Sequence, residues 1–390
     1  MKPKNRLLVF VCVFIITMVI SIWYIVMCFK RRQATTDTNT NIDAHKLSFY
    51  RFTNDTLDTQ ATSMPLIESM REALSESSNS LTSVDGFEGA QFVLFETLNR
   101  IDQIIHKVHY AKQNRYIYGI SGTDLIASKS LLCLNMRDTL GTNIEQRVFP
   151  KTYVLSVPED RQQLAYAQSN GVVFIMKKNV QRQEGYHITT SLQDIQHQYE
   201  QDNDYVVVQE MLQDPYIIRG RKINLRVYLL VVIKESECSF YIYKNGFLYY
   251  TPESFEPHST DPAKVITTGY IDRKVYEENP LSLDDLRIHM GPSKYDAMFD
   301  NIATTMQYVR KTYTPIFNIH NRSLPGTKFL IFGCDIAPDA RGQVKLMEIN
   351  KGPDLSYKDE RDKEVKLNML KDTFSIVGLL PPRDHRFVRV

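Results

Sequence analysis

The sequence predicts a mixed α/β or α+β body preceded by a single membrane-spanning helix, and three observations support this fold class. Helix-like and strand-like apolar patterns are mixed along most of the chain, without an internal repeat. The segment Leu7–Phe29 contains no charged residue. Near the C-terminus, two apolar runs are joined by the turn-rich connection "PDARGQ", which is typical of a β-hairpin.

The overall composition is that of a globular protein with one large multi-lobed domain or two domains. The chain has 390 residues, of which 43% are hydrophobic and 24% are charged. The formal net charge of +2 provides no general attraction to nucleic acid, so we expect no nucleic-acid partner.

The cysteines show neither metal-ligand spacing nor a pairing pattern. Cys12 and Cys28 lie in the apolar N-terminal run, and Cys133, Cys238 and Cys334 are scattered along the rest of the chain. This distribution favours reduced, structural cysteines and a catalytic part in the cytosol.

Residues 1–32 are predicted to form a membrane anchor with basic flanks. At 1.5 Å per residue, a helix over Leu7–Phe29 spans the roughly 30 Å hydrocarbon core of a bilayer. A cleaved signal peptide is the alternative, but its apolar region is usually shorter and no small-residue cleavage site follows here. The flanking charges do not decide the orientation, because they are balanced between Lys2, Lys4 and Arg6 on one side and Lys30, Arg31 and Arg32 on the other.

The remaining chain is expected to divide into a stalk, a folded body and a tail. Residues 33–86 are rich in Ser, Thr, Asn and Asp and predict a flexible stalk. From Phe87, apolar residues recur at helical spacing through Ile105, so the body is expected to begin with a helix and to cover residues 87–380. Residues 381–390 form a basic tail, expected to be a solvated terminus, and contact with acidic partners or lipid head groups is the alternative.

The C-terminal hairpin carries the first candidate site. Strand alternation places Glu348 and Asn350 on one face, and a turn centred near Arg341 places Asp335 opposite Glu348 on that face. Two carboxylates so close repel one another unless a cation lies between them or one is protonated. Magnesium takes oxygen ligands and commonly binds substrate phosphates, so the pattern indicates a magnesium site. A surface hairpin with solvated acids is the alternative.

Two further segments place basic side chains on strands. In the strand that begins near Ile223, Lys222 and Arg226 face one way and suit phosphate or carboxylate oxygens. Lys177 ends the strand of "GVVFIMKKN", next to a polar loop, where a lysine can hold nucleotide phosphates. Exposed basic residues on a solvated sheet face are the alternative for both segments.

Together these segments resemble the tubulin-tyrosine ligase-like family of the ATP-grasp superfamily. The stretches that carry the resemblance are "FPKTYVLSVPED", "VVQEMLQDPYIIRGRKINLRVYLLV", "ENPLSLDDLR", "FGCDIAPDARGQVKLMEINKGPDL" and "KEVKLNMLKDTFSIVGL". The resemblance covers roughly residues 91–380 and implies an ATP-grasp fold, with the nucleotide site between two lobes.

Matching residues to the family's motifs implies a role for each. Asp335, Glu348 and Asn350 would coordinate two magnesium ions, and Lys222 and Arg226 would hold the γ phosphate and the acyl substrate. Lys129 corresponds to a phosphate-binding lysine. The residues expected to contact ATP are Lys129, Lys177, Gln209, Glu210, Met211, Leu212, Lys222 and Thr267.

The sequence departs from the family pattern at several positions. Val265, Ile266, Thr267 and Thr268 stand where the family has "HLTN", so Thr268 replaces its asparagine. The loop after Lys177 has one glycine, Gly185, so Gln181 and Arg182 are expected to cover the phosphates instead. Asn224 replaces an aspartate, and Lys351 and Gly352 replace "AS".

The resemblance implies an ATP-dependent ligase that joins an amino acid to a protein carboxylate through an acyl phosphate. Its partners would be ATP, Mg²⁺, an amino acid donor and a protein acceptor, foremost a tubulin tail. A membrane-tethered, catalytically impaired nucleotide-binding member, or a ligase for a small-molecule or peptide acceptor, are the alternatives.

ATP and tubulin are cytosolic, so we expect a single-pass membrane protein whose body faces the cytosol. The sequons at Asn54 and Asn321 would be used only in the opposite topology.

Overall fold

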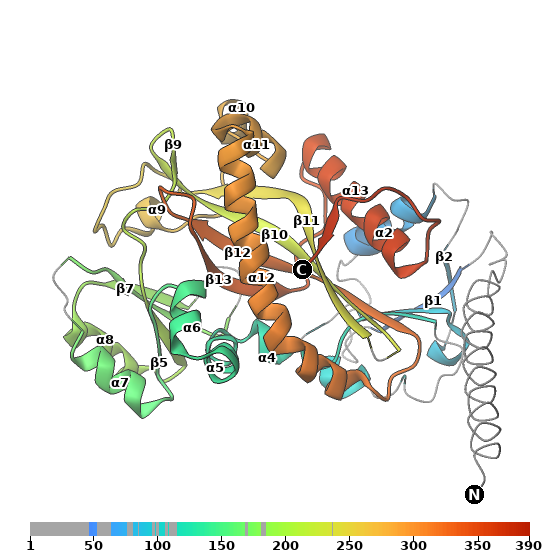
Figure 1. The fold of residues 1–390 in the computed structure, drawn as a ribbon, viewed down its shortest axis with the longest axis horizontal. Helices are drawn as coiled ribbons and strands as arrows, with labels where there is room; N and C mark the ends of the chain where they lie inside the picture. The colour runs from blue at the N-terminus through green and yellow to red at the C-terminus, as the bar shows by residue number, and fades with distance from the viewer. Residues whose placement is uncertain are drawn as a thin grey trace, which may run out of the picture. The chain divides into compact units, whose positions relative to one another are not determined.

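Two β-sheets organise the part of the chain that the computed structural model describes (Figure 1). The described residues are 47–52, 64–75, 81–84, 86–95, 98, 101–105, 108, 115–167, 171–180, 185–235 and 237–390. Within them, a ten-stranded sheet has the order β14-β11-β10-β12-β4-β3-β1-β2, with β13 paired to β12 and β9 to β10. A four-stranded sheet has the order β5-β8-β6-β7. The mixed α/β class predicted from the sequence is confirmed.

The strands of the large sheet are β1 (Leu47–Phe52), β2 (Leu81–Ser83), β3 (Phe92–Phe95), β4 (Tyr116–Tyr118), β9 (Ile217–Ile218), β10 (Arg221–Lys234), β11 (Glu237–Tyr250), β12 (Thr327–Pro338), β13 (Val344–Lys351) and β14 (Phe387–Arg389). The smaller sheet contains β5 (Thr152–Val154), β6 (Phe174–Lys178), β7 (Tyr186–Thr189) and β8 (Tyr205–Glu210). The longer helices are α2 (Met64–Ser75), α5 (Lys129–Leu140), α7 (Pro158–Ala165), α8 (Leu192–Gln201), α11 (Leu283–Met290), α12 (Pro292–Asn321) and α13 (Glu360–Val377). The shorter ones are η1 (Phe87–Gly89), α3 (Ile101–Ile104), α4 (Thr123–Ala127), α6 (Thr142–Val148), α9 (Pro262–Val265) and α10 (Val275–Glu278).

Strand β12 is the centre of the large sheet because both of its edges are paired. One edge pairs with β10 from Lys328 to Ile336. The other edge pairs first with β4 in parallel, at Thr327–Phe329, and then with β13 antiparallel, at Phe332–Pro338. This branching connects the parallel N-terminal strands and the C-terminal hairpin through one strand.

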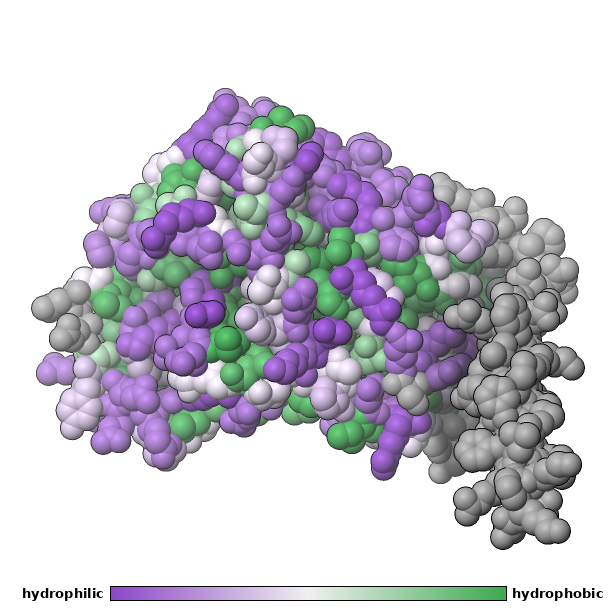
Figure 2. Space-filling model, in the orientation of Figure 1, coloured by the Kyte–Doolittle hydropathy of each residue, from purple (hydrophilic) through white to green (hydrophobic). Residues whose placement is uncertain are grey.

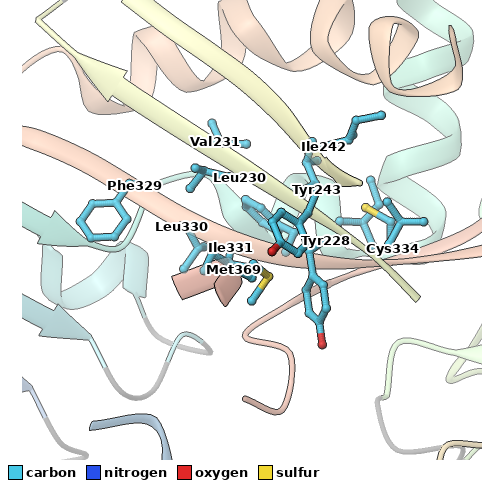
Figure 3. Close-up of a cluster of buried hydrophobic side chains, with 14 of the residues drawn as sticks. Tyr228, Leu230, Val231, Ile242, Tyr243, Phe329, Leu330, Ile331, Cys334 and Met369 are labelled. Carbon is cyan, nitrogen blue, oxygen red and sulfur yellow. The ribbon is translucent and has the colours of Figure 1, made fainter. Parts of the chain in front are cut away.

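Helices cover both faces of the large sheet and close its core (Figures 1 and 3). On β12, Phe329 contacts Phe374 of α13, and Phe332 contacts Phe317 of α12. Because positions 329 and 332 differ by an odd number, their side chains point to opposite faces of the strand. Because both faces are covered, the central strands consist of continuous apolar runs. One such run is Leu229–Ile233 on β10, in which every residue is buried.

The predicted stalk is wrong for the part of residues 33–86 that the structure describes. Within residues 33–86, β1 pairs in parallel with β2 and β3, and α2 packs against α13. Phe49 of β1 lies opposite Phe92 and is 4% exposed, although its polar neighbours along the chain suggested flexibility. The short apolar clusters are buried by distant elements, a contribution that local composition does not show.

The helix expected from Phe87 to Ile105 is also wrong. Phe92–Phe95 form β3, which pairs with β1 on one edge and β4 on the other, and the α-helix covers only Ile101–Ile104. All four residues of β3 are buried, so their apolar run fits a strand with two covered faces as well as a helical stripe.

The C-terminal tail is part of the sheet rather than a solvated end. Strand β14 pairs antiparallel with β11 between Tyr241 and Tyr243. Arg386 donates hydrogen bonds to Asp284, and Phe387 packs on Tyr243. The basic residues of this tail therefore include internal ion-pair partners.

The predicted anchor, Leu7–Phe29, lies outside the described residues, and it stays a prediction. Among the residues that are described, no helix is both long and apolar enough to cross a membrane. Asn54 is likewise outside them. Asn321 is fully buried, and its side chain is hydrogen-bonded to Ser121 and Phe317, so the folded chain offers no acceptor for glycosylation there.

Replacing Phe49 by Ala tests the corrected N-terminal boundary. Loss of a buried phenylalanine side chain should lower the free energy of unfolding by about 3 kcal/mol, measured as a shift of the denaturant midpoint. The exposed Thr82 of β2 provides the control, since Thr82→Ala should change it by under about 0.5 kcal/mol. Equal midpoints for both variants and the wild type would restore the flexible stalk.

Candidate functional site

A cavity of about 590 Å³ is lined by residues of both sheets. The small sheet contributes Ile175 and Lys177 of β6 and the end of β8, while the large sheet contributes the cationic face of β10 and the hairpin β12–β13. The residues that the family motifs assigned to ATP, magnesium or the acyl substrate all line this cavity: Lys129, Lys177, Gln209, Glu210, Met211, Leu212, Lys222, Arg226, Thr267, Asp335, Glu348 and Asn350.

The central feature of the cavity is a row of three charges across adjacent strands. Arg226 lies opposite Asp335, and Asp335 lies opposite Glu348, as the alternation of the hairpin predicted. Arg226 donates to both carboxylate oxygens of Asp335, with Nε–Oδ1 at 2.6 Å and Nη2–Oδ2 at 3.2 Å. Its guanidinium also lies over the ring of Tyr249, 5.0 Å from the centroid, which fixes its plane.

A β-bulge on β13 lets two consecutive residues of the hairpin line the cavity. The register shifts between Asp335 and Ile336, because Met347 is an extra residue on β13. A bulge reorients the side chains beside it, and both Met347 and Glu348 line the cavity. Met347 and Ile175 thus supply apolar walls from the two sheets, next to the charged row.

The two carboxylates differ in proton affinity. Burial raises the pKa of Asp335 to about 6; the Arg226 guanidinium opposes this rise and the charge of Glu348 adds to it. Burial also acts to raise the pKa of Glu348, but Lys129, Lys177 and the hydrogen bond from Asn350 outweigh it and hold the pKa at about 2. Glu348 is therefore ionised at neutral pH.

The donor set of the hairpin fits a magnesium ion. Asp335, Glu348 and Asn350 offer carboxylate and amide oxygens, and the Asn350 Nδ2 donates to Glu348 Oε1 at 3.0 Å. The like-charge pair Asp335–Glu348 is the arrangement that a divalent cation relieves. Within the described residues, no group of three His, Cys, Asp or Glu side chains could hold a metal ion. In the hairpin, the third donor is the amide of Asn350.

Lys129 links the helix α5 to both sheets. Its Nζ donates to the carbonyl of Val180 at 2.9 Å and lies 3.5 Å from Glu348 Oε2. Its backbone N–H donates to Asn179, whose amide donates to Ser128, the N-cap of α5. The lysine is thereby held at the boundary between the charged row and the end of β6.

Burial of two further lysines in the cavity disfavours their charged forms. Lys177 donates to Gln209 Oε1 at 2.6 Å, and burial lowers its pKa to about 8, with Glu348 opposing and Lys129 adding. Lys222 is 6% exposed and donates to the carbonyl of Val265 at 2.9 Å. Burial lowers the pKa of Lys222 to about 8, and Lys177 adds to the effect. Both ammonium groups would gain from a bound anion.

At the other end of the cavity, Glu210 is fixed by two partners on or beside β5. Tyr153 donates its hydroxyl to Glu210 Oε1 at 2.8 Å, and Lys151 pairs with the same oxygen at 3.0 Å. The backbone of Met211 donates to the carbonyl of Val173. The segment Gln209–Leu212 therefore has a defined conformation where it borders the cavity.

The sequence model of the Tubulin-tyrosine ligase family matches residues 119–386. The chain belongs to the tubulin-tyrosine ligase family. It is 26% identical over 317 residues to Tubulin polyglutamylase ttll6 of Danio rerio, a match that covers 75% of this chain and 39% of that protein.

Two further relatives in the family show the same partial coverage. Probable tubulin polyglutamylase TTLL9 of Bos taurus is 29% identical over 216 residues, covering 52% of this chain and 44% of that protein. Tubulin glycylase 3B of Drosophila melanogaster is 22% identical over 316 residues, covering 73% and 40%. The chain thus matches about two-fifths of the length of these relatives.

The departures from the family pattern have distinct structural consequences. Thr267 lines the cavity, whereas Thr268, at the position of the family's asparagine, does not. Thr268 instead bonds to Tyr250 through its backbone and accepts from the N–H of Tyr270. Asn224 does line the cavity, and its buried Oδ1 has no hydrogen-bond partner among the described residues. Gln181 and Arg182 lie outside those residues.

Sequence reasoning missed the side of the cavity formed by residues distant in the chain. This side includes Tyr249, Gly269, Tyr270, Asp354 and Lys358. Tyr249 could have been found from the alternation of β11, because it lies opposite Asn224. Nothing in the local sequence indicates that Tyr270 and Lys358 meet.

The buried ammonium of Lys222 gives a pH dependence to the nucleotide-free protein. Its folded-state pKa of about 8 lies below the ordinary 10.5, so between these values only the unfolded chain retains the proton. The free energy of unfolding should therefore rise with pH in this window, by about 1.4 kcal/mol per pH unit from this residue.

Lys222→Met should be more stable than the wild type near neutral pH and should lose this slope, as measured by denaturant midpoints between about pH 7 and about pH 10. Lys311→Gln, an exposed change on α12, should keep the wild-type slope. Parallel curves for Lys222→Met and the wild type would contradict the assignment.

Proposed function

We propose that this protein is an ATP-dependent ligase that joins an amino acid to a protein carboxylate, in the first place a carboxylate of an acidic tubulin tail. The observation that carries the proposal is the row Arg226–Asp335–Glu348, surrounded by lysines in one cavity. Membership of the tubulin-tyrosine ligase family supports it. The names of the relatives, which are polyglutamylases and a glycylase of tubulin, support tubulin as the acceptor.

The reaction requires the cavity to stabilise phosphoryl transfer rather than to supply a nucleophile. The acceptor carboxylate oxygen attacks the γ phosphorus of ATP, ADP leaves, and an acyl phosphate forms. The amine of the donor amino acid then attacks the acyl carbon, phosphate leaves, and the amine loses a proton as the amide bond forms. Each step moves negative charge that fixed cations can stabilise.

The residues of this chain have complementary roles in that scheme. Lys177, Lys129 and Lys222 would bind phosphate oxygens, and their limited solvation increases the gain from an anion. Arg226 would orient the acyl phosphate through its guanidinium, which Asp335 and Tyr249 hold in place. Gln209–Leu212 would border the adenine ring, between the apolar walls of Ile175 and Met347.

Asp335, Glu348 and Asn350 would hold the magnesium. When bound, the metal supplies positive charge that offsets the charge of the outer phosphates. The protein contributes three donors on paired strands, in a geometry fixed by the ladder of hydrogen bonds.

The body would act at a membrane, on its cytosolic side. The support is the uncharged segment Leu7–Phe29 together with ATP and tubulin as substrates. The buried Asn321 is compatible with this placement, because it removes one of the two sequons from the folded body. Glycosylation of the expressed full chain at Asn54 would overturn the placement.

A second function, nucleotide binding without ligation, is favoured by one observation, the replacement of the family's asparagine by Thr268, which lies outside the cavity lining. A ligase for a small-molecule or peptide acceptor is distinguished by its product rather than by the site.

Glu348→Gln tests the ligase. The full chain in detergent is incubated with ATP, Mg²⁺, labelled amino acids and tubulin, acidic peptides or small carboxylates, and products are read by mass spectrometry. Loss of a metal ligand and of a charge in the row should reduce product by about a hundredfold or more.

Glu364→Gln, which changes an exposed carboxylate on α13, should leave the yield unchanged. ATP binding without product in the wild type would favour the second function, and equal product from Glu348→Gln would exclude the proposed role of the hairpin.

Thr268→Asn tests whether the departure limits catalysis. Because Thr268 does not line the cavity, restoring asparagine should change kcat by under about threefold, which is less than 1 kcal/mol. An increase of about a hundredfold would show that the wild type is an impaired enzyme.

A further inference from the structure

Beyond Arg226, the cavity continues along a side that the reaction scheme does not use. Tyr249 separates the charged row from a region lined by Gly269, Tyr270, Asp354 and Lys358. A second hollow of about 30 Å³ shares Tyr249, Gly269, Asp354 and Lys358 with the main cavity. This hollow has room for little more than a water molecule, so a second substrate would occupy the main cavity beside it.

Among the described cations that line this hollow, all but one pair with a carboxylate. Lys366 pairs with Asp362 at 2.9 Å, and Arg273 pairs with Asp359. Asp354 accepts from the backbone and the hydroxyl of Ser356.

The exception is Lys358. Its Nζ donates to the carbonyl of Gly269 at 3.0 Å and lies 5.0 Å from the ring centroid of Tyr270. Among the described residues, no carboxylate forms an ion pair with Lys358.

Lys358 is an exposed residue, so its ammonium can be reached from solvent. Partial burial lowers its pKa, Lys366 adds to the effect, and Asp354 opposes it. An ammonium that is open to solvent and has no carboxylate partner can form a charged hydrogen bond with a carboxylate that arrives from outside. The chemistry of the region therefore suits a carboxylate.

Tyr270 shows that this region opens to solvent. Its side chain is 74% exposed although it lines the cavity and lies beside Lys358. The backbone around it is fixed, because Tyr270 donates its N–H to Thr268, which in turn bonds to Tyr250 of β11. A fixed, exposed ring next to a cation suits an extended chain that enters from outside.

We propose that Lys358 and Tyr270 form the docking site for an acidic acceptor peptide, in which Lys358 binds a carboxylate next to the one being modified and Tyr270 contacts the peptide chain. The proposal rests on the proposed ligase function and names the residues that select its acceptor. The exposure of Tyr270 favours the acceptor chain over the free donor amino acid, which needs no open path for a continuing backbone.

Peptide binding and kinetics test the site together. A fluorescent oligoglutamate peptide is titrated into the full chain with a non-hydrolysable ATP analogue and Mg²⁺, with the oligoglutamine peptide as the uncharged comparison. Lys358→Gln should weaken oligoglutamate binding about tenfold, as expected for one charged hydrogen bond, and Lys358→Arg should retain most of it. Tyr270→Ser should weaken binding and Tyr270→Phe should not.

The matched control is Lys311→Gln, which removes an exposed lysine charge on α12, away from the cavity lining. It should bind the peptide as the wild type does. In turnover assays, Lys358→Gln should raise KM for the acceptor about tenfold, while kcat and the KM values for ATP and the donor amino acid stay unchanged.

Three results would overturn the proposal: equal oligoglutamate affinity of Lys358→Gln and the wild type, equal binding of oligoglutamine and oligoglutamate, or a rise in KM for the donor alone. Failure of the proposed function looks different, since the wild type would then form no amide product with any acceptor. Product formation with unchanged acceptor KM in Lys358→Gln would reject only the docking site.

Discussion

The close approach of two carboxylates on neighbouring strands is the constraint on which the site depends. Asp335 and Glu348 face one another because β12 and β13 pair in that register, and the sheet cannot separate them. Their repulsion in a partly buried cavity is opposed by Arg226 on one side and by Lys129 and Lys177 on the other. The cations that offset this repulsion come from β10, α5 and β6, three elements far apart in the sequence.

The same arrangement leaves cations that the fold itself does not satisfy. Lys222 is buried and donates to a backbone carbonyl, and Lys177 donates to an amide oxygen. Neutral oxygen partners stabilise an ammonium less than a carboxylate does. The protein thus keeps its cavity ready for an anion at the expense of its own stability, as is common at functional sites.

The segment that follows Asn350 shows how the N-terminal layers contribute to the site. Lys351 is buried and donates to the carbonyl of Leu98 at 2.9 Å while pairing with Asp124 of α4. Ser69 of α2 donates to the carbonyl of Leu355 at 3.2 Å. Leu98 and Ser69 precede the family match, which begins at residue 119. Residues that precede the family match therefore contact the end of the strand that carries the proposed metal ligands and the segment that follows it.

Local patterns identified the chemical groups of the site but not all the elements around it. The alternation in β10 and in the hairpin placed Lys222, Arg226, Asp335 and Glu348 correctly, because side-chain direction in a strand follows from a period of two. Composition failed for residues 47–52 and 387–389, since short polar-flanked segments form strands only when a distant strand offers its edge. The apolar run at β3 was misassigned to a helix because a strand buried on both faces is as continuously apolar as a buried helical segment.

By itself, the sequence determined the mixed α/β class, the family and the residues that carry charge toward the cavity, because strand periodicity and motif order are encoded locally. The tertiary structure decided which of those charges meet, where β1 and β14 join the sheet, and that Tyr270 lies against Lys358. Pairing between distant strands and contacts between loops depend on the packing of the whole body, and no stretch of sequence specifies them alone.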